Sequence, residues 1–182
     1  MIYYLSLGSN INPEQHISSA LEQLCKQFHA AIVFPVLRTQ PCAIHSQHSF
    51  LNTIAIVVSD WSAAALKTWL NQLEEQHGRD RNDPLRSEKD RTLDIDILTA
   101  QSDFRWLSAD QFDEPYIRAS FMALQQADNN TVALKLGEQS LGHQAATIHT
   151  HDSSGHVLVV EDSLDGLLQC FETALHRQQS LA

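Results

Sequence analysis

Two aspartates separated by one residue, Asp94 and Asp96, carry the clearest chemical signal in the sequence. They fall in a short run rich in Ile and Leu, which predicts a strand over residues 92–99. Side chains alternate along a strand, so both carboxylates point to one face and repel each other unless a cation lies between them. Such hard oxygen ligands suit Mg²⁺, which completes its shell with phosphate oxygens and water. The pair predicts a magnesium site; an ordinary polar strand face is the plainer alternative.

Basic residues are concentrated directly before this pair, with five of the twelve within thirteen positions. They are Arg79, Arg81, Arg86, Lys89 and Arg91. The chain as a whole is acidic, with a formal net charge of −10, which argues against general nucleic-acid binding. Cations gathered in an acidic protein fit one small polyanion, and guanidinium groups bind phosphate oxygens two at a time. The segment therefore favours metal-assisted phosphoryl transfer. A solvated loop whose acidic residues balance the charge locally is the alternative.

The elements that must position these residues follow from hydrophobic periodicity. Two amphipathic helices are expected between β-rich runs, in the order strand, helix, strand, strand, helix, strand. In chain order these elements cover residues 3–7, 13–28, 30–37, 50–58, 62–77 and 92–99. This order predicts an α+β fold, a ferredoxin-like sandwich with its helices on one face of a mainly antiparallel sheet. The first and last strands are expected side by side at the centre of the sheet, so that residues at their ends meet.

The sequence after about residue 100 gives weaker signals of secondary structure. We expect residues 1–126 to form the βαββαβ core and residues 127–182 to form a C-terminal extension packed on the same domain. Within the extension, residues 128–155 are polar and loop-like, residues 156–160 resemble a strand, and a final amphipathic helix starts after Ser163. Neither a membrane-spanning run nor a signal-peptide pattern is visible, so a cytoplasmic protein is expected.

Cysteine and histidine usage favours no second metal site. The three cysteines are widely spaced and fit buried thiols in a reducing compartment better than a disulfide framework. They are Cys25, Cys42 and Cys170. The histidines of the C-terminal part lack the tight paired spacing of zinc ligands, so they are interpreted as scattered surface residues. The relevant ones are His143, His149, His151 and His156.

Four segments, in this order, carry a resemblance to a known family. They are Leu7-Gly8-Ser9-Asn10, Phe50-Leu51-Asn52, Glu74 followed by Gly78-Arg79-Asp80-Arg81, and Arg91-Thr92-Leu93-Asp94-Ile95-Asp96-Ile97-Leu98. Over about residues 2–100 the chain resembles the 6-hydroxymethyl-7,8-dihydropterin pyrophosphokinases of folate biosynthesis, and the last motif is the most specific. The resemblance implies the same ferredoxin-like fold. It also implies a cytoplasmic transferase, a monomer or weak dimer, that moves pyrophosphate from ATP to the pterin hydroxymethyl group and releases AMP. Neither nucleic acid nor membrane is an expected partner.

The resemblance further implies roles for individual residues. Asp94 and Asp96 would hold two Mg²⁺ ions against the phosphates of ATP. The catalytic cations would be Arg79, Arg81 and Arg91. The ATP site would comprise Glu74, Arg79, Arg91, Ile97, Tyr116 and Arg118, although Glu74 could instead orient an arginine. The pterin site would comprise Thr39, Phe50, Asn52 and Phe121, with Phe121 in the place of a ring-stacking phenylalanine.

Several positions depart from the family pattern. Asp90 stands where the family usually has a proline, and Glu88 where an aromatic residue is common. Tyr116 replaces a histidine in a shortened segment, and the basic loop is two residues longer than expected. Two other functions therefore stay open. One is a non-catalytic paralogue that binds pterin and nucleotide; the other is a ferredoxin-like nucleotidyl transferase, which would release pyrophosphate rather than AMP.

Overall fold

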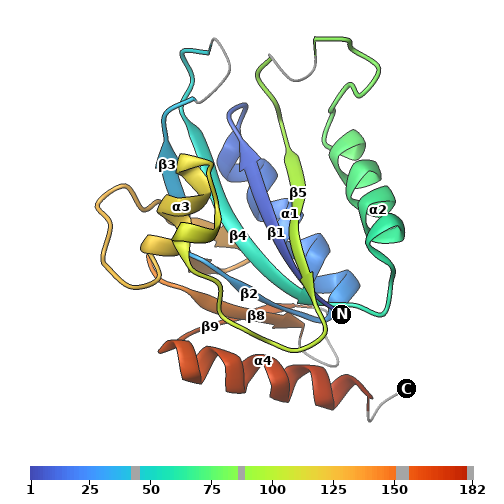
Figure 1. Cartoon of the computed structure of the whole chain (residues 1–182), viewed down its shortest axis with the longest axis vertical. Coiled ribbons are helices and arrows are strands. Elements are labelled where there is room, and N and C mark those ends of the chain that lie inside the picture. Colours follow the sequence, from blue (N-terminus) through green and yellow to red (C-terminus); the bar gives the residue numbers. More distant parts are fainter. Residues whose placement is uncertain (42–45, 86–88, 151–155, 180–182) are drawn as a thin grey trace.

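The computed structural model of the chain describes residues 1–41, 46–85, 89–150 and 156–179, with side chains as far as residue 173. Figure 1 shows its elements and labels most of them. In chain order they are β1 (Ile2–Ser9), α1 (Pro13–Phe28), β2 (Ala30–Val33), β3 (Leu37–Thr39), β4 (Phe50–Val58), α2 (Ala63–Gln76), β5 (Asp94–Gln101), the 3₁₀ helix η1 (Ala109–Gln111), α3 (Pro115–Met122), β6 (Leu134–Leu136), β7 (Gln139–Leu141), β8 (Ala146–Thr150), β9 (Val157–Glu161) and α4 (Leu164–Gln179).

The main sheet has the strand order β5-β1-β4-β2-β8-β9, with β3 paired to β4, and every pairing in it is antiparallel. The first and last strands of the core, β1 and β5, are neighbours, as the sequence predicted. The prediction that both lie at the centre was wrong. Among the described strands, β5 pairs with β1 alone and is therefore an edge strand. The other side of β1 is occupied by β4.

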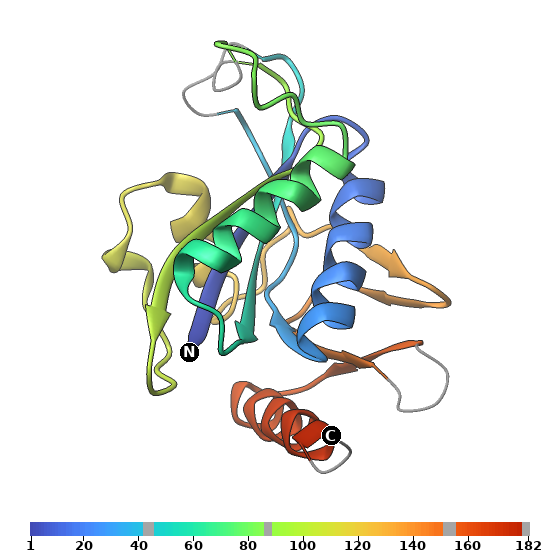
Figure 2. The same ribbon diagram turned by 90° about the vertical axis from the view of Figure 1, so that its right-hand side faces the viewer.

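Helices cover both faces of the sheet: the two helices of the predicted core share one face, as expected, and further helices lie on the other. Helices α1 and α2 cover one face and α3 and α4 the other, and Figure 2 shows α1 and α3 on opposite sides. Strand β1 explains why: Tyr3, Leu5 and Leu7 pack toward α1 and α2, whereas Tyr4 packs toward α3 and α4. A strand that is apolar at consecutive positions must be buried on both faces.

Helices α1 and α2 begin and end within one residue of the predicted ranges, and local features explain their ends. Pro13 opens α1, and the Ser62 hydroxyl caps α2 by accepting a hydrogen bond from the Ala65 amide at 3.2 Å. Gly78 follows α2 with a φ of +86°, a conformation that glycine adopts without a steric penalty. The final strand and helix, β9 and α4, were also predicted correctly.

The polar stretch before β9 was expected to be a loop, and this was wrong. It contains β6 and β7, which form a two-stranded sheet, and β8, which pairs with β2. These strands are three to five residues long and owe their pairing partly to distant segments, so local pattern does not reveal them. No helix in the described ranges has the length and apolar character needed to cross a membrane.

The cysteine prediction concerns two described thiols. Cys25 is buried on α1, and burial raises the pKa of its thiol to about 12. Cys170 on α4 is half-buried. Cys25 is a free thiol, as expected of a packed cysteine, whereas Cys42 lies outside the described residues.

Two histidines join the start of α1 to the end of α2. The Nδ1 atoms of His16 and His77 lie 2.8 Å apart, and their ring centroids are separated by 5.1 Å. Burial lowers the pKa of both imidazoles, and the proximity of His16 lowers the pKa of His77 further. One neutral ring therefore donates to the other, and this bond ties the two helices together immediately before Gly78 and Arg79.

This pair predicts a pH-dependent stability. Because both folded-state pKa values are lowered, the unfolded chain binds protons first as the pH falls through about 6.5, and the free energy of unfolding decreases. Urea titrations at pH 7.5 and 5.5 measure this loss. The double variant His16→Gln/His77→Gln should show a smaller loss than the wild type. The exposed His156→Gln serves as control, and an unchanged pH dependence in the double variant would contradict the prediction.

Candidate active site

The aspartate pair lies near one end of β5, and its side chains alternate with buried ones as predicted. Leu93 and Ile95 are fully buried in the cluster that packs against α1 and α2. Asp94 and Asp96 therefore point to the opposite face, with 25% and 61% of their side-chain surface exposed. Both carboxylates thus line the same accessible face of the sheet.

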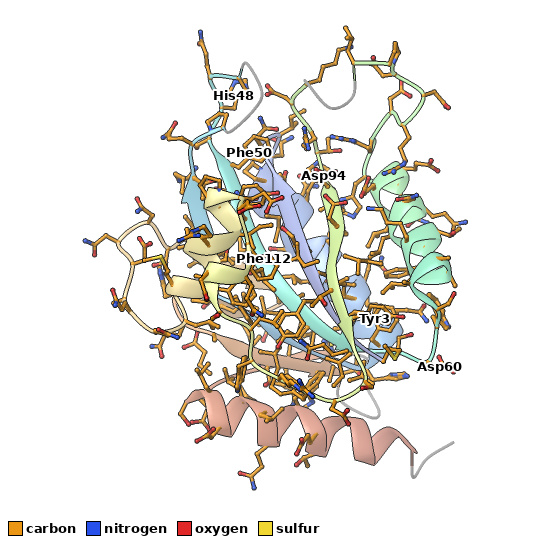
Figure 3. All side chains as sticks on the ribbon, in the orientation of Figure 1. Tyr3, His48, Phe50, Asp60, Asp94 and Phe112 are labelled. Carbon is orange, nitrogen blue, oxygen red and sulfur yellow. The ribbon has the colours of Figure 1, made fainter. Side chains whose placement is uncertain are left out.

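Strand register brings the pair together with the residues expected to bind a pterin. Gly8 on β1 lies opposite Asp94 on β5 and opposite Asn52 on β4, so all three positions share a face. Phe50, two residues before Asn52, lies on that face as well. Figure 3 shows Phe50 and Asp94 at the same end of the sheet, far from Asp60 at the other end. A glycine, which has no side chain, thus separates the acidic and aromatic parts of the site.

The two arginines expected to contact phosphate converge on Asp94. Arg91 donates from Nη1 to Asp94 Oδ2, and Arg79 Nη2 lies 3.6 Å from Asp94 Oδ1. The Arg79 and Arg91 side chains are only 9% and 16% exposed. The guanidinium carbon of Arg91 also lies 5.9 Å from the centre of the Phe50 ring, a cation–π distance. These contacts place two cations on Asp94, and one of them, Arg91, also reaches the aromatic side of the site.

Arg81 and Glu74 form a separate ion pair beside the strand. Glu74 is fully buried, and its carboxylate accepts hydrogen bonds from Arg81 Nη1 and, at 2.9 Å, from the backbone amide of Ile95. Burial raises the pKa of Glu74, and the nearby Asp94 raises it further, while the Ile95 amide and Arg81 oppose the shift. Of the two roles considered for Glu74, the orientation of an arginine fits these contacts.

The expected pterin residues are brought together by the β3–β4 pairing. Thr39 lies opposite Phe50, and Asn52 donates from Nδ2 to Thr39 Oγ1 at 2.7 Å. Asn52 is buried, whereas Phe50 and Thr39 are half-buried. The Asn52 amide is therefore held in one orientation beside an accessible aromatic ring, as recognition of a planar polar heterocycle requires.

Gly8 is required for that orientation. A Cβ atom on residue 8 would lie 2.8 Å from Asn52 Oδ1, too close for the amide to keep its place. We expect Gly8→Ala to shift Asn52, to break its bond to Thr39 and to raise the Kd for a hydroxymethyl pterin by about tenfold. Fluorescence titration of the folded variant measures this change; an unaltered Kd would show that the amide tolerates the methyl group.

Asn10 and Asp90 form a polar network that the sequence did not reveal. Asn10 accepts from the Arg91 backbone amide and donates to Asp90 Oδ1, both at 2.7 Å. The other Asp90 oxygen lies 2.7 Å from His48 Nδ1. Hydrogen bonds from Ser46 and His48 lower the pKa of Asp90. Asp90, which departs from the family pattern, thus anchors the start of β5 to the segment before β4. The nearby position 88 lies outside the described residues.

Of the remaining ATP-site candidates, the structure brings Tyr116 to the aspartate pair. Burial is the main cause that raises the pKa of the Tyr116 phenol, and the negative charges of Glu114, Asp96 and Asp94 raise it further. Arg118, two residues later on α3, is exposed and donates to the Phe112 carbonyl at 3.4 Å. It lines a cavity of about 320 Å³ between α3, η1 and the start of α4. Tyr116 and Arg118 therefore point in different directions.

Ile97 also lies apart from the acidic face. Its half-buried side chain packs against the apolar cluster beneath α1 and α2, on the other side of β5 from Asp94 and Asp96. Any contact of its side chain with a nucleotide would therefore be on the other face from the carboxylates. The structure does not bring the Ile97 side chain together with the predicted metal ligands.

Phe121, which was expected to stack on the pterin, has its ring packed in the apolar cluster beneath α3. Its ring is 3% exposed and packs on Phe112 at 4.9 Å, with the planes 10° apart, and edge-on against Phe34 at 5.2 Å. The reason is helical spacing: Phe121 lies four residues after the buried Ile117, on the inner side of α3. Phe121 is thus part of the core.

Lys67 is a site residue that sequence analysis missed. Its ammonium group donates to Asp96 Oδ1 at 2.9 Å and to the carbonyl of Ile95 at 2.6 Å. Lys67 precedes Glu74 by seven residues, two helical turns, so both face β5 from the same side of α2. That spacing was visible in the sequence, but only the packing of α2 beside β5 gives it meaning.

The arrangement offers two guanidinium groups to a polyphosphate and two carboxylates to a metal. Within the described ranges, no group of three or more His, Cys, Asp or Glu side chains is placed to hold a metal ion. His143, His149 and His156 belong to no such group, and His151 lies outside those ranges. Two carboxylates suit an ion that takes its other ligands from phosphate and water, as Mg²⁺ does.

Comparisons with known proteins agree with this geometry. The model of the 7,8-dihydro-6-hydroxymethylpterin-pyrophosphokinase family matches residues 4–145. A 2-amino-4-hydroxy-6-hydroxymethyldihydropteridine pyrophosphokinase of Haemophilus influenzae is 31% identical over 98 residues, which is 52% of this chain and 59% of that protein. The protein of the same name from Porphyromonas gingivalis is 31% identical over 99 residues, 53% of this chain and 67% of that protein. The matched part of the chain thus spans about three fifths to two thirds of these relatives.

The family match covers more than three quarters of the chain, including every strand that contributes to the site. Both relatives carry the name of one activity, and the segments that resemble the family are those that the structure gathers around Asp94. The chain belongs to the 7,8-dihydro-6-hydroxymethylpterin-pyrophosphokinase family.

Proposed function

We propose that this protein is a Mg²⁺-dependent pyrophosphokinase that transfers the terminal pyrophosphate of ATP to the hydroxymethyl group of 6-hydroxymethyl-7,8-dihydropterin and releases AMP. One observation carries the proposal. Asp94, with two largely buried arginines on its carboxylate, shares one face and one end of the sheet with Phe50 and Asn52. A site for phosphate and metal thus adjoins a site for a flat heterocycle, as a reaction between ATP and a pterin requires.

The aspartate pair fits the metal that the reaction needs. Its two carboxylates are accessible on one face, and their oxygens are ligands that Mg²⁺ prefers. We propose that Asp94 and Asp96 hold two Mg²⁺ ions. When bound, the ions would neutralise the phosphate charge that opposes attack. Since both carboxylates contact cations of the protein, metal binding would change their partners.

The protein's own groups would orient the two substrates. Phe50 and Asn52 would fix the pterin ring so that its hydroxymethyl oxygen faces the β-phosphorus of ATP. That oxygen forms the new bond to phosphorus and gives up its proton, while the bond from the β-phosphorus to the oxygen it shares with the α-phosphate breaks and AMP leaves. Arg79 and Arg91 would turn from Asp94 to the phosphate oxygens and stabilise their charge.

The finer architecture belongs to this proposal as well. We propose that residues 1–126 are a ferredoxin-like core and residues 127–182 an extension packed on it. The order β5-β1-β4-β2, with α1 and α2 as the connecting helices, supports the first part, and the pairing of β8 with β2 supports the second. The protein would act in the cytoplasm, as a monomer or weak dimer.

An assay of AMP formation tests the function. The full chain is incubated with ATP, Mg²⁺ and the hydroxymethyl dihydropterin, and AMP and pterin pyrophosphate are separated by chromatography. We expect equal amounts of both products, and neither when pterin or Mg²⁺ is omitted. Binding of pterin and a non-hydrolysable ATP analogue without turnover would identify a binding paralogue. Release of inorganic pyrophosphate would identify nucleotidyl transfer.

A further inference from the structure

Helix α2 completes the open edge of β5 at one residue, Ile95. The Ile95 amide donates to Glu74 Oε1 at 2.9 Å, and its carbonyl accepts from Lys67 Nζ at 2.6 Å. An edge strand has no neighbour for these outward-facing groups, so two side chains of α2 take the place of a further strand. Ile95 separates Asp94 from Asp96, so this attachment fixes the backbone between the two carboxylates.

Lys67 is also held on one of the carboxylates. Its Nζ lies 2.9 Å from Asp96 Oδ1, while Asp94 is paired with Arg79 and Arg91. The Lys67 side chain is 33% exposed, and the carbonyl of Ile95 keeps its ammonium group in place. Each carboxylate of the pair therefore faces a cation of the protein.

We propose that Lys67 competes with the metal for Asp96 and thereby sets the metal affinity of the site. An ammonium group and a divalent cation on one carboxylate repel each other, so Lys67 on Asp96 Oδ1 opposes the binding of metal to that carboxylate and is displaced as the metal binds. Free metal ions would bind weakly, and a metal carried by nucleotide would bind better because the phosphates offer the displaced ammonium group a new partner. This inference rests on the proposed function only in taking Asp96 as a metal ligand.

The test measures metal binding without turnover. The full-length protein is titrated with Mn²⁺, and bound and free ions are distinguished by electron paramagnetic resonance. Lys67→Met removes the charge and keeps the length of the side chain, and Lys67→Gln keeps a hydrogen-bond donor without charge. We expect both variants to bind Mn²⁺ more tightly, with a Kd lower by on the order of tenfold. Lys67→Arg keeps the charge and should stay close to the wild type.

Two matched variants make the outcome specific. Lys135→Met removes a charge from an exposed lysine of β6 and should leave the Kd unchanged. Asp96→Asn should weaken Mn²⁺ binding; if it does not, Asp96 is no metal ligand, and both the inference and the proposed metal site fall. If Asp96→Asn weakens binding but both neutral Lys67 variants bind no more tightly than the wild type, the inference alone is overturned. Urea unfolding confirms that each variant is folded.

Discussion

Replacement of Asp96 by Asn is expected to lower the rate of AMP formation by about a thousandfold while the protein stays folded. The loss follows from removing a charged oxygen ligand from a site where metal and cations carry the catalysis, an effect of several kcal/mol on the barrier. Because 61% of the Asp96 side-chain surface is exposed, its replacement should change the free energy of unfolding by no more than about 0.5 kcal/mol. Initial rates and urea titrations measure the two effects.

Asp94→Asn should lower the rate to a similar extent, but with a cost in stability. Its carboxylate neutralises Arg79 and Arg91, whose side chains are 9% and 16% exposed, so the substitution leaves two nearly buried guanidinium groups without that charge. Asp60→Asn, at the other end of the sheet in Figure 3, controls for the loss of a carboxylate as such. If Asp94→Asn and Asp96→Asn both retain wild-type rates, the aspartate pair has no part in the reaction.

Phe121→Ala is expected to lower the free energy of unfolding by about 3–5 kcal/mol, the cost of a large core truncation. The ring is packed among Phe34, Phe112 and Tyr4, so its loss leaves a cavity beneath α3. Urea unfolding at neutral pH gives the value. This prediction distinguishes the observed core position from the pterin-stacking role that the family resemblance implied.

Phe50→Ala provides the matched comparison, since its ring is half-buried beside Arg91. We expect this variant to lose pterin affinity with a smaller change in stability than Phe121→Ala. A Phe121→Ala protein that is as stable as the wild type but binds pterin more weakly would instead indicate that Phe121 contacts the substrate.

The sequence was sufficient wherever a feature depends on near neighbours along the chain. Strand alternation was enough to place Asp94 and Asp96 on one face and Leu93 and Ile95 on the other. The start of α2 at Ser62 was predicted because helix capping involves residues within one helical turn. The order of strands and helices in the core followed for the same reason, since each element has its own periodicity.

Features that depend on pairing between distant segments could not be predicted in this way. The position of β5 at the sheet edge depends on β4 having paired with the other side of β1. The second helical layer depends on α3 and α4 finding the face that carries Tyr4. Phe121 matched a family position by local motif, but the packing of α3 determined that its ring enters the core.

The aspartate pair itself shows where the division falls. Its residue types and spacing determined that two carboxylates would share a face and could bind Mg²⁺. Only the tertiary structure decided which groups meet them: Arg79 and Arg91 on Asp94, Lys67 on Asp96, and Phe50 and Asn52 across Gly8. The physical reason is the distance along the chain between the residues involved. Alternation is a property of one strand, whereas these contacts require several strands and a helix to have packed together.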